Sequence, residues 1–285
     1  MKDYIPALTE YLKTLPVPLT RVSIIEGNGE PETIELSPAN PCQNVYSVAK
    51  TFTMTGIGLL YDKGLVKPED KICDIFRDEF PETGADERWG LVNIDMLLRH
   101  SAGLPGGFLD IDCHKSSEFT ADFLNYMFTY PLAYTPDTEA RYSDGAFYLL
   151  GRVISKITGR SVDDFMWEEM FTDLDFQEIA WSKCPKGFVI GASGLYVHTA
   201  DMVKLGAVYL NGGCFKGRRY LSKEWVELVK ERSYGVDWDE NHKYFYKGGM
   251  RGQKLLIYPE QNRAVAVQSF CGDTGAVEKW FLKNG

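Results

Sequence analysis

The chain has 285 residues, and its 31 lysines and arginines against 40 aspartates and glutamates give a formal net charge of −9 at pH 7. This acidic balance argues against nucleic acid as a partner, because nucleic-acid-binding proteins usually carry a basic surface. Hydrophobic residues make up 44% and charged residues 25% of the chain, which is typical of a soluble globular protein and excludes disordered or collagen-like chains.

Hydrophobic periodicity and turn residues divide the chain into predicted elements. It begins with a helix over 4–15 and a hairpin of strands over 21–25 and 33–36. Helices follow over 47–61, 93–100, 118–129, 144–157 and 161–171. The last third is mixed, with strands over 188–190 and 195–198, helices over 199–210 and 222–231, strands over 243–246, 254–258 and 264–270, and a helix over 276–282.

The order of these elements predicts the fold class. Strands lie at both ends of the chain and helices in the middle, and the tight turns between consecutive strands favour antiparallel pairing. We therefore expect an α/β (α+β) fold, in which a central antiparallel sheet is built from both chain ends and flanked by helices. The predicted sheet domain is discontinuous, over 1–64 and 181–285, and a mostly helical domain is inserted over 65–180.

Neither a transmembrane segment nor a signal peptide is expected. Stretches without a charged residue are shorter than the roughly 20 residues that cross a bilayer. Met1, Lys2 and Asp3 are followed by further charges before any apolar segment forms. We therefore predict a cytoplasmic protein.

The cysteines are predicted to be free thiols, because they are scattered along the chain without any C-x-x-C spacing. The six are Cys42, Cys73, Cys113, Cys184, Cys214 and Cys271. His114 lies beside Asp110, Asp112 and Cys113, but in a polar loop, and we expect no metal site there.

The sharpest local motif is a serine and a lysine three residues apart, Ser47 and Lys50. In a helix, residues i and i+3 share one face, so the lysine amine can touch the serine hydroxyl. A desolvated lysine with a lowered pKa can take the serine's proton and make the serine a nucleophile. Taken alone, the motif is more typical of a serine N-cap followed by a solvated lysine.

Two later segments place further polar groups in a matching order. Tyr142 and Ser143 directly precede an amphipathic helix, and Lys247 ends a predicted strand. Taken singly, Tyr142 could be a core tyrosine and Lys247 a surface lysine. Together with Ser47, their order and spacing match a known three-motif arrangement.

The sequence resembles the serine β-lactamase and penicillin-binding-protein superfamily, most closely its class C β-lactamase-like hydrolases and esterases. Residues 52–70 resemble the family's first long helix and its exit, 93–105 its L-L-x-H-x-S-G-L-P loop, and 142–159 its Y-S-N segment. With the motifs at Ser47 and Lys247, the resemblance covers nearly the whole chain. It implies a β-lactamase/transpeptidase-like fold.

The resemblance also implies roles for individual residues. Ser47 would be the acylated nucleophile, and Lys50 or Tyr142 would accept its proton. The backbone N–H groups of Ser47 and Met250 would form the oxyanion hole. The phenol pKa of Tyr142 is expected to be lowered by Lys50 and Lys247. The mechanism requires neither a metal nor an organic cofactor.

Two positions depart from the family's pattern. Asp144 stands where penicillin-recognising relatives usually have Asn, and Gly248 where they usually have Thr or Ser. An ionised Asp144 cannot donate a hydrogen bond to a substrate amide. We expect it to pair with Lys50 instead, to raise the lysine's pKa and to shift the base role toward Tyr142. Both departures favour simple esters, or a substrate bearing an amine, over β-lactams.

The remaining candidates concern substrate binding and electrostatics. The substrate-binding residues are predicted to be Asp144, Lys247, Gly248, Gly249 and Arg251. Arg251 could hold a substrate carboxylate, although a solvated or structural ion pair is favoured. With Lys50 and Lys247 it predicts a locally cationic site in an acidic chain. His100 is expected to be a structural hydrogen-bonding residue rather than a base.

We therefore predict a serine hydrolase that forms an acyl-enzyme on Ser47 with a small-molecule or peptide-like ester, amide or lactam. Esterase-like or peptidase-like activity is favoured over efficient β-lactamase activity. The alternative is a non-catalytic or slowly deacylating penicillin-binding or sensor module, which Asp144 and Gly248 motivate. The sequence leaves the oligomeric state open.

Overall fold

The computed structural model describes residues 4–115, 118–270 and 272–284, so the predicted free thiol of Cys271 lies outside the described residues. Its main sheet is antiparallel, with the strand order β2-β1-β11-β10-β9-β8. These strands are β1 (Leu19–Glu26), β2 (Glu32–Glu35), β8 (Asp237–Trp238), β9 (Phe245–Gly249), β10 (Gln253–Tyr258) and β11 (Arg263–Ser269). Strands from the two ends of the chain pair directly, β1 with β11, which confirms the predicted sheet.

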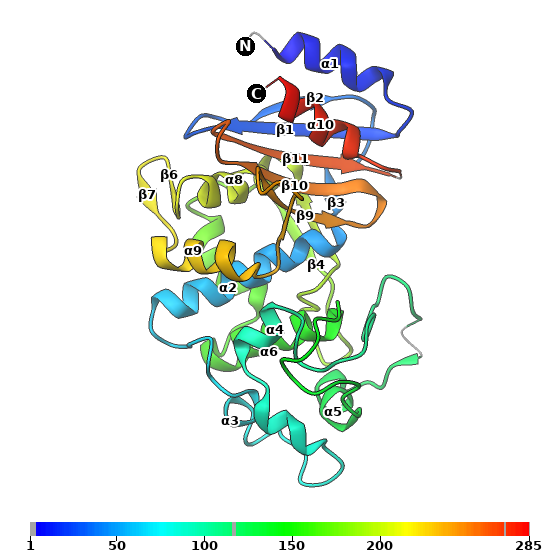
Figure 1. Ribbon diagram of the computed structural model, residues 1–285, viewed down its shortest axis with the longest axis vertical. Helices are drawn as coiled ribbons and strands as arrows, with labels where there is room; N and C mark the ends of the chain where they lie inside the picture. Colours follow the sequence, from blue (N-terminus) through cyan, green and yellow to red (C-terminus); the bar gives the residue numbers. More distant parts are fainter. Residues whose placement is uncertain (1–3, 116–117, 271, 285) are drawn as a thin grey trace.

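Helices cover both faces of this sheet. They are α1 (Ile5–Thr14) and α10 (Gly275–Lys283) on one face and α8 (Thr199–Leu210) on the other (Figure 1). Strand β11 alternates side chains of two sizes, so that Val265 and Val267 face the cluster around α1 and α10 while Ala264 belongs to the larger cluster on the opposite face. The small side chains allow α8 to approach closely, because a methyl group on Gly206 would lie 3.2 Å from the Ala264 Cβ.

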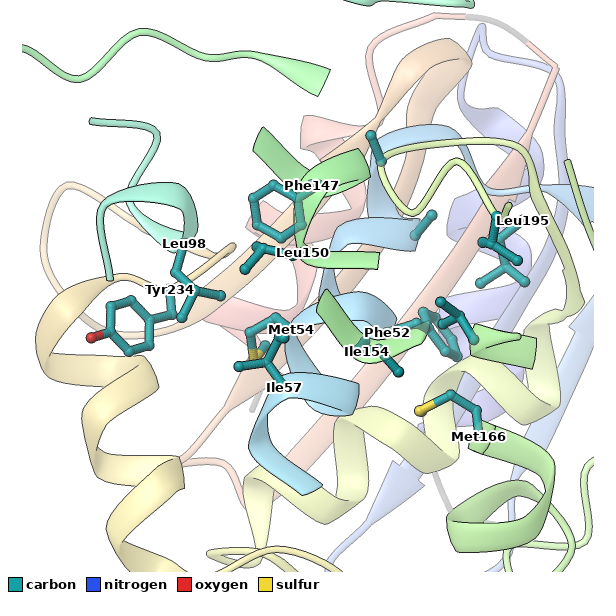
Figure 2. Packing of buried hydrophobic residues seen from close by; sticks show 14 of the residues in the cluster. Phe52, Met54, Ile57, Leu98, Phe147, Leu150, Ile154, Met166, Leu195 and Tyr234 are labelled. Carbon is teal, nitrogen blue, oxygen red and sulfur yellow. The ribbon is translucent and has the colours of Figure 1, made fainter. Parts of the chain in front are cut away.

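A long buried helix, α2 (Ala49–Asp62), packs against α6 (Asp144–Thr158) in the middle of the molecule. All side chains from Ala49 to Leu60 are buried. The two helices cross closely at Gly56, where a methyl group would lie 2.6 Å from Ile154 Cδ1. Figure 2 shows the side chains that fill this region, among them Met54, Ile57, Phe147, Leu150 and Ile154. This packing places the first residues of α2 and α6 side by side.

The other helices begin and end at the expected local signals. They are α3 (Ile72–Ile75), α4 (Ile94–Leu98), α5 (Phe123–Thr129), α7 (Val162–Met166) and α9 (Lys223–Arg232), with the 3-10 turns η1 (Tyr46–Val48), η2 (Glu87–Leu91) and η5 (Met250–Gly252) and the π-helical η4 (Trp167–Phe171). Asn93 caps α4 by accepting a hydrogen bond from Met96 N–H at 2.9 Å, and Gly159 ends α6 with a φ of 68°. Helix α5 begins later than predicted, because Asp122 caps it through the Asn125 N–H.

A second, smaller sheet was predicted only in part. Its order is β3-β5-β4, with β3 (Cys42–Asn44), β4 (Ile179–Trp181) and β5 (Leu195–His198), and a hairpin of β6 (Cys214–Phe215) and β7 (Arg218–Arg219) lies apart from it. Strand β5 is where the sequence predicts it. Strands β3 and β4 are too short to show a period, and the strand predicted over 188–190 is wrong, since only an isolated bridge from Val189 to Lys183 forms there.

The larger hydrophobic cluster includes residues of both predicted domains, for example Phe128 and Leu255. The division into a discontinuous sheet domain and an inserted helical domain therefore stays a prediction. Within the described ranges, no helix is long and apolar enough to cross a membrane.

Candidate active site

Ser47 lies at the sharp turn between strand β3 and helix α2. The turn is made by Tyr46, whose φ of 48° is uncommon for a residue with a side chain, and whose N–H donates to Asn44 Oδ1 at 2.8 Å. The capping positions of η1 and α2 are occupied by Val45 and Val48. The Ser47 hydroxyl therefore does not cap the helix, and it stays available for chemistry.

Lys50 is fully buried, and its Nζ has three polar neighbours. Nζ lies 2.6 Å from Asp144 Oδ1, 2.9 Å from the carbonyl oxygen of Ala192 and 3.3 Å from Ser47 Oγ. Asp144 is the first residue of α6, and Ala192 lies in the loop before β5. The structure thus brings together Ser47 and Lys50 as expected, and it adds the expected pairing with Asp144.

This arrangement accommodates both protonation states of Lys50. An ionised carboxylate and a carbonyl oxygen only accept, so Nζ donates one hydrogen to Asp144 and one to Ala192. An ammonium donates its third hydrogen to Ser47, whereas a neutral amine directs its lone pair at the Ser47 hydroxyl. Burial lowers the pKa of Lys50 more than Asp144 raises it. The expected pair therefore forms and raises the pKa of Lys50, but the effect of burial is larger, and the net shift is downward.

Tyr142 lies directly before α6, with its ring between two lysines. The ring centroid is 4.6 Å from Lys50 Nζ and 5.0 Å from Lys247 Nζ. Burial nevertheless raises the pKa of Tyr142 to about 12, against the lowering effects of Lys247 and of a hydrogen bond with Ser47. The expected lowering of this pKa is wrong: although 44% of the residue is exposed, packing of the ring against its neighbours outweighs the nearby cations. Tyr142 is a neutral phenol at pH 7.

His100 acts as a structural acceptor, as its loop position suggested. Its Nδ1 accepts the backbone N–H of Ser143 at 3.2 Å, and its ring lies 4.5 Å from that of Tyr142. Burial, together with the charges of Lys247 and Lys50, holds its pKa well below the usual range. The neutral His100 ring packs against the Tyr142 ring and accepts the N–H of the next residue, Ser143. We therefore assign it a positioning role for Tyr142 and no role in proton transfer.

The third motif lies on strand β9, beside the nucleophile. Lys247 is buried, and its Nζ is 3.3 Å from Asp237 Oδ2. A methyl group on Gly249 would overlap the carbonyl oxygen of Val45 and lie 3.3 Å from the backbone nitrogen of Ser47. The strand thus passes directly against the nucleophile's backbone. Met250 lies just beyond the strand in the turn η5, not on the strand as expected, and its role in an oxyanion hole stays a prediction.

This close approach predicts opposite outcomes for two neighbouring glycines. Gly249→Ala is expected to displace β9 from Ser47 and to lower kcat/KM about 100-fold, the scale of a misplacement by about 1 Å. Gly248→Ala is the matched control for the position of β9, since nothing lies within 4 Å of a methyl group there, and it should leave the thermal unfolding of the protein unchanged. Esterase kinetics and thermal unfolding of both variants check this, and equal losses in the two would contradict the close-contact argument.

Two aspartates that the sequence did not assign to the site lie beside it. Carboxylate oxygens of Asp110, Asp112 and Asp144 are within 4.8 Å of one another, and Asp112 accepts a hydrogen bond from the Ser193 hydroxyl. Burial raises the pKa of both Asp112 and Asp144. Three carboxylates facing Lys50 make this half of the site acidic, so the expected cationic character is wrong here. In the sequence, the polar character of the loop around Asp110 and Asp112 was the one signal that pointed to these carboxylates.

Two cavities adjoin the site. One of about 420 Å³ is lined by Tyr142, Lys247 and Arg232, among others. The other, of about 290 Å³, is lined by Tyr46 and Arg251, among others.

Arg251 is exposed, its φ is 59°, and its guanidinium lies 6.0 Å from the Tyr46 ring centroid. It forms no ion pair within the described residues, so the favoured ion pair is absent from that part of the chain.

The wall of the larger cavity depends on Asp95, at the start of α4. Its carboxylate accepts hydrogen bonds from Arg99 (2.6 Å), Arg232 (2.8 Å) and Tyr234 (2.5 Å). Burial alone would raise its pKa, but these hydrogen bonds outweigh burial and lower it. Asp95 therefore ties α4 to the end of α9 and shapes the cavity next to Lys247.

Asp95→Asn is expected to lower the free energy of unfolding by about 2–3 kcal/mol at pH 7, the usual scale for hydrogen bonds to a charged group. Because the folded-state pKa is lowered, this stabilisation is complete above the ordinary aspartate pKa of about 4 and fades as the pH falls further. Urea unfolding of both proteins from pH 7 to pH 3 checks this. A difference that stays constant with pH would contradict the ionic origin.

The described residues contain two groups of side chains that could hold a metal ion. One is Asp110, Asp112 and Asp144 at the candidate active site, and the other is Cys42, Glu178 and His198. The first group shares Asp110 and Asp112 with the loop considered in the sequence but not its histidine, since His114 Nδ1 instead lies 3.1 Å from Glu118 Oε2.

Comparison with known proteins defines the class of the fold. The chain superimposes on a D-stereospecific amidohydrolase from Streptomyces sp. with a TM-score of 0.74, at 17% sequence identity over 98% of each chain. Together with the antiparallel sheet and its flanking helices, this shows a β-lactamase/transpeptidase-like fold. Residues 38–276 match the family Beta-lactamase, and the chain belongs to this family.

Curated relatives in this family differ in their chemistry. The chain is 29% identical to Penicillin-binding protein 4 of Amycolatopsis lactamdurans over 255 residues, which are 73% of this chain and 66% of that protein. It is 28% identical to Lovastatin esterase of Penicillium rubens over 129 residues, 43% of this chain and 32% of that protein. The chain thus matches between about a third and two thirds of the length of these relatives.

Proposed function

We propose that the protein is a serine hydrolase that acylates Ser47 and acts on esters or amides rather than efficiently on β-lactams. The observation that carries this proposal is the environment of Lys50 Nζ. Two of its neighbours, Asp144 and the Ala192 carbonyl, accept hydrogens, and the third is the Ser47 hydroxyl at 3.3 Å. Two of the positions on Nζ are therefore taken by acceptors, and the remaining one, through which Lys50 can exchange a proton, faces the Ser47 hydroxyl.

The proposed reaction follows from these contacts. Ser47 Oγ attacks the substrate carbonyl carbon, and its proton passes to the neutral amine of Lys50. The oxyanion lies between the backbone N–H groups of Ser47 and Met250. The Lys50 ammonium returns the proton to the leaving group, directly or through the Tyr142 hydroxyl, and water then releases the acyl group. The direction of the pKa shifts favours Lys50 over Tyr142 as the base.

The substrate preference rests on the two departures from the family's pattern. Asp144 is held by Lys50 at 2.6 Å and has no hydrogen to donate when ionised. Gly248 offers no hydroxyl and leaves open space beside β9. The carboxylates of Asp110 and Asp112 add negative charge close by. These groups favour a substrate with an uncharged or amine-bearing acyl part, and they disfavour an anionic one.

A side-by-side screen tests this proposal. Nitrophenyl esters, a chromogenic cephalosporin and D-amino-acid amides are offered to the wild type and to Ser47→Ala. We expect turnover of esters or amides by the wild type alone and weak or no turnover of the cephalosporin. Cephalosporin turnover faster than that of every ester and amide would contradict the substrate preference, and turnover by Ser47→Ala would contradict the nucleophile.

The base assignment predicts the pH profile. Activity should rise with pH as Lys50 loses its proton, because only the neutral amine accepts from Ser47. Asp144 raises the pKa of Lys50, so Asp144→Asn should move the rising limb of kcat/KM to lower pH. Tyr142→Phe should lower kcat/KM without moving that limb. A limb that is unchanged in Asp144→Asn and lost in Tyr142→Phe would assign the base to Tyr142.

A second candidate function is a binding or sensor module that acylates without deacylating. Asp144 and Gly248 favour it, since both depart from the pattern of penicillin-recognising relatives. It predicts a β-lactam adduct on Ser47 that is stable for hours without steady-state turnover, measured by mass spectrometry. Multiple turnovers of any ester by the wild type would contradict it.

A further inference from the structure

A row of three metal-binding side chains crosses the small sheet, outside the candidate active site. Cys42 on β3 pairs directly with His198 on β5. On the other side of β5, Ile179 pairs with Val197, so the next step of the same antiparallel register places Glu178 opposite His198. Directly opposite residues point to the same face of a sheet with Cβ atoms about 5 Å apart. The register therefore gathers a thiol, an imidazole and a carboxylate.

The three possible ligand atoms are close together and accessible. Each residue offers one such atom, and all three atoms lie within 4.8 Å of one another. His198 Nε2 is 3.9 Å from Glu178 Oε2, with side-chain exposures of 19% and 71%. Within the described part of the chain, neither the Cys42 thiol nor the His198 ring forms a hydrogen bond. The three groups are thus free to turn toward a common ion.

We propose that Cys42, His198 and Glu178 bind a zinc ion, with water in the fourth position. Cysteine sulfur, histidine nitrogen and glutamate oxygen are the donors that zinc takes in proteins, at about 2.0–2.3 Å in a tetrahedron. A thiolate with an imidazole selects zinc over magnesium or calcium, which prefer oxygen donors alone. Glu178, the most exposed of the three, closes the site by a side-chain rotation.

The local charge supports a cation at this place. The carboxylates of Glu178 and Asp201 both lie close enough to the Cys42 thiol to interact with it electrostatically. Asp201 is itself held by Lys204, at 2.9 Å, and by the N–H of Gln177. Because Lys204 already balances Asp201, the charge left for a divalent ion to offset is that of Glu178 and of the thiolate that forms on binding. When the ion binds, the sulfur forms its bond to zinc and the thiol proton leaves to the buffer, about one proton per ion.

The proposed site holds three strands together close to the nucleophile. Strand β3 leads directly into the turn that carries Ser47, and Cys42 also lines the cavity of about 290 Å³ that Tyr46 and Arg251 border. Zinc would therefore fasten β3 to β5 and β4 beside this cavity. Because it binds only the folded chain, it should raise the melting temperature. This inference does not depend on the proposed hydrolase function.

Cobalt is the spectroscopic probe for the test, with zinc as competitor. The reduced, chelator-treated protein is titrated with Co²⁺, and we expect one equivalent to give a thiolate-to-cobalt charge-transfer band and tetrahedral d–d bands, which Zn²⁺ then removes. Cys42→Ser should abolish the charge-transfer band. Cys42→Ser and His198→Gln should each weaken zinc binding at least about 100-fold, and Zn²⁺ should no longer raise their melting temperature.

Two variants serve as matched controls. Cys73→Ser removes another half-buried thiol, and His114→Gln removes the histidine of the polar loop. Both should bind zinc as the wild type does, with circular dichroism showing that all variants are folded. No charge-transfer band in the wild type would overturn the proposal. So would zinc binding that is lost in His114→Gln, or binding that is equal in Cys42→Ser and Cys73→Ser.

Discussion

Replacing Ser47 by alanine is expected to reduce ester or amide hydrolysis to background, a loss of about 10⁶-fold on the scale of other serine hydrolases that lose their nucleophile. The physical reason is that Lys50 then has no hydroxyl to deprotonate, and Tyr142 is a neutral phenol at pH 7. A fluorophosphonate or an activated ester should add mass to the wild type at Ser47 and leave Ser47→Ala unmodified.

The matched control is Ser222→Ala, which changes the N-cap residue of helix α9. Ser222 caps α9 by accepting the N–H of Trp225 at 3.0 Å, so its loss should cost about 1 kcal/mol of stability. It should leave kcat/KM unchanged. Ser47→Ala should show the reverse, with little change in unfolding and no activity. A wild type that reacts with neither reagent under turnover conditions would refute the nucleophile.

Much of the site was predictable because the chemistry lies in local sequence. Ser47, in the turn η1, and Lys50, in the first turn of α2, are three residues apart, so their contact follows from the helical i, i+3 spacing. Tyr142 and Lys247 are distant in sequence, and the resemblance to a family placed them. The sheet of both chain ends was also predictable, because strand patterns lie at both ends of the sequence and tight turns between consecutive strands favour antiparallel pairing.

Other features of the site could not be predicted, because they depend on which groups the folded chain buries and brings together. The effect of Asp144 on the pKa of Lys50 and that of the lysines on the pKa of Tyr142 were predicted from neighbouring charges, and at both residues loss of hydration outweighs these charges. The carbonyl of Ala192 is a backbone group, which no side-chain pattern reveals. Asp110 and Asp112 reach the site through a long loop whose path follows from packing, since the Gly145 N–H of α6 donates to the Phe108 carbonyl at 3.0 Å.

The Lys50–Asp144 pair carries the second large prediction. Both side chains are buried, with 0% and 5% exposure, and they are 2.6 Å apart. Lys50→Met removes the base and should lower kcat/KM about 10²–10⁴-fold. It also leaves a buried carboxylate without its partner, which costs about 3–5 kcal/mol when the charge must stay ionised. Because burial already raises the pKa of Asp144, protonation should limit the loss to the lower part of this range.

A double-mutant cycle separates the two effects. Adding Asp144→Asn to Lys50→Met removes the stranded carboxylate, so the double variant should be more stable than Lys50→Met alone, while its kcat/KM should stay as low as that of Lys50→Met. The destabilisation of Lys50→Met should also shrink at lower pH, since protonation of Asp144 then no longer costs free energy. Chemical unfolding at pH 5 and pH 8 measures this. A double variant less stable than Lys50→Met at both pH values would mean that packing, not charge, holds these two side chains together.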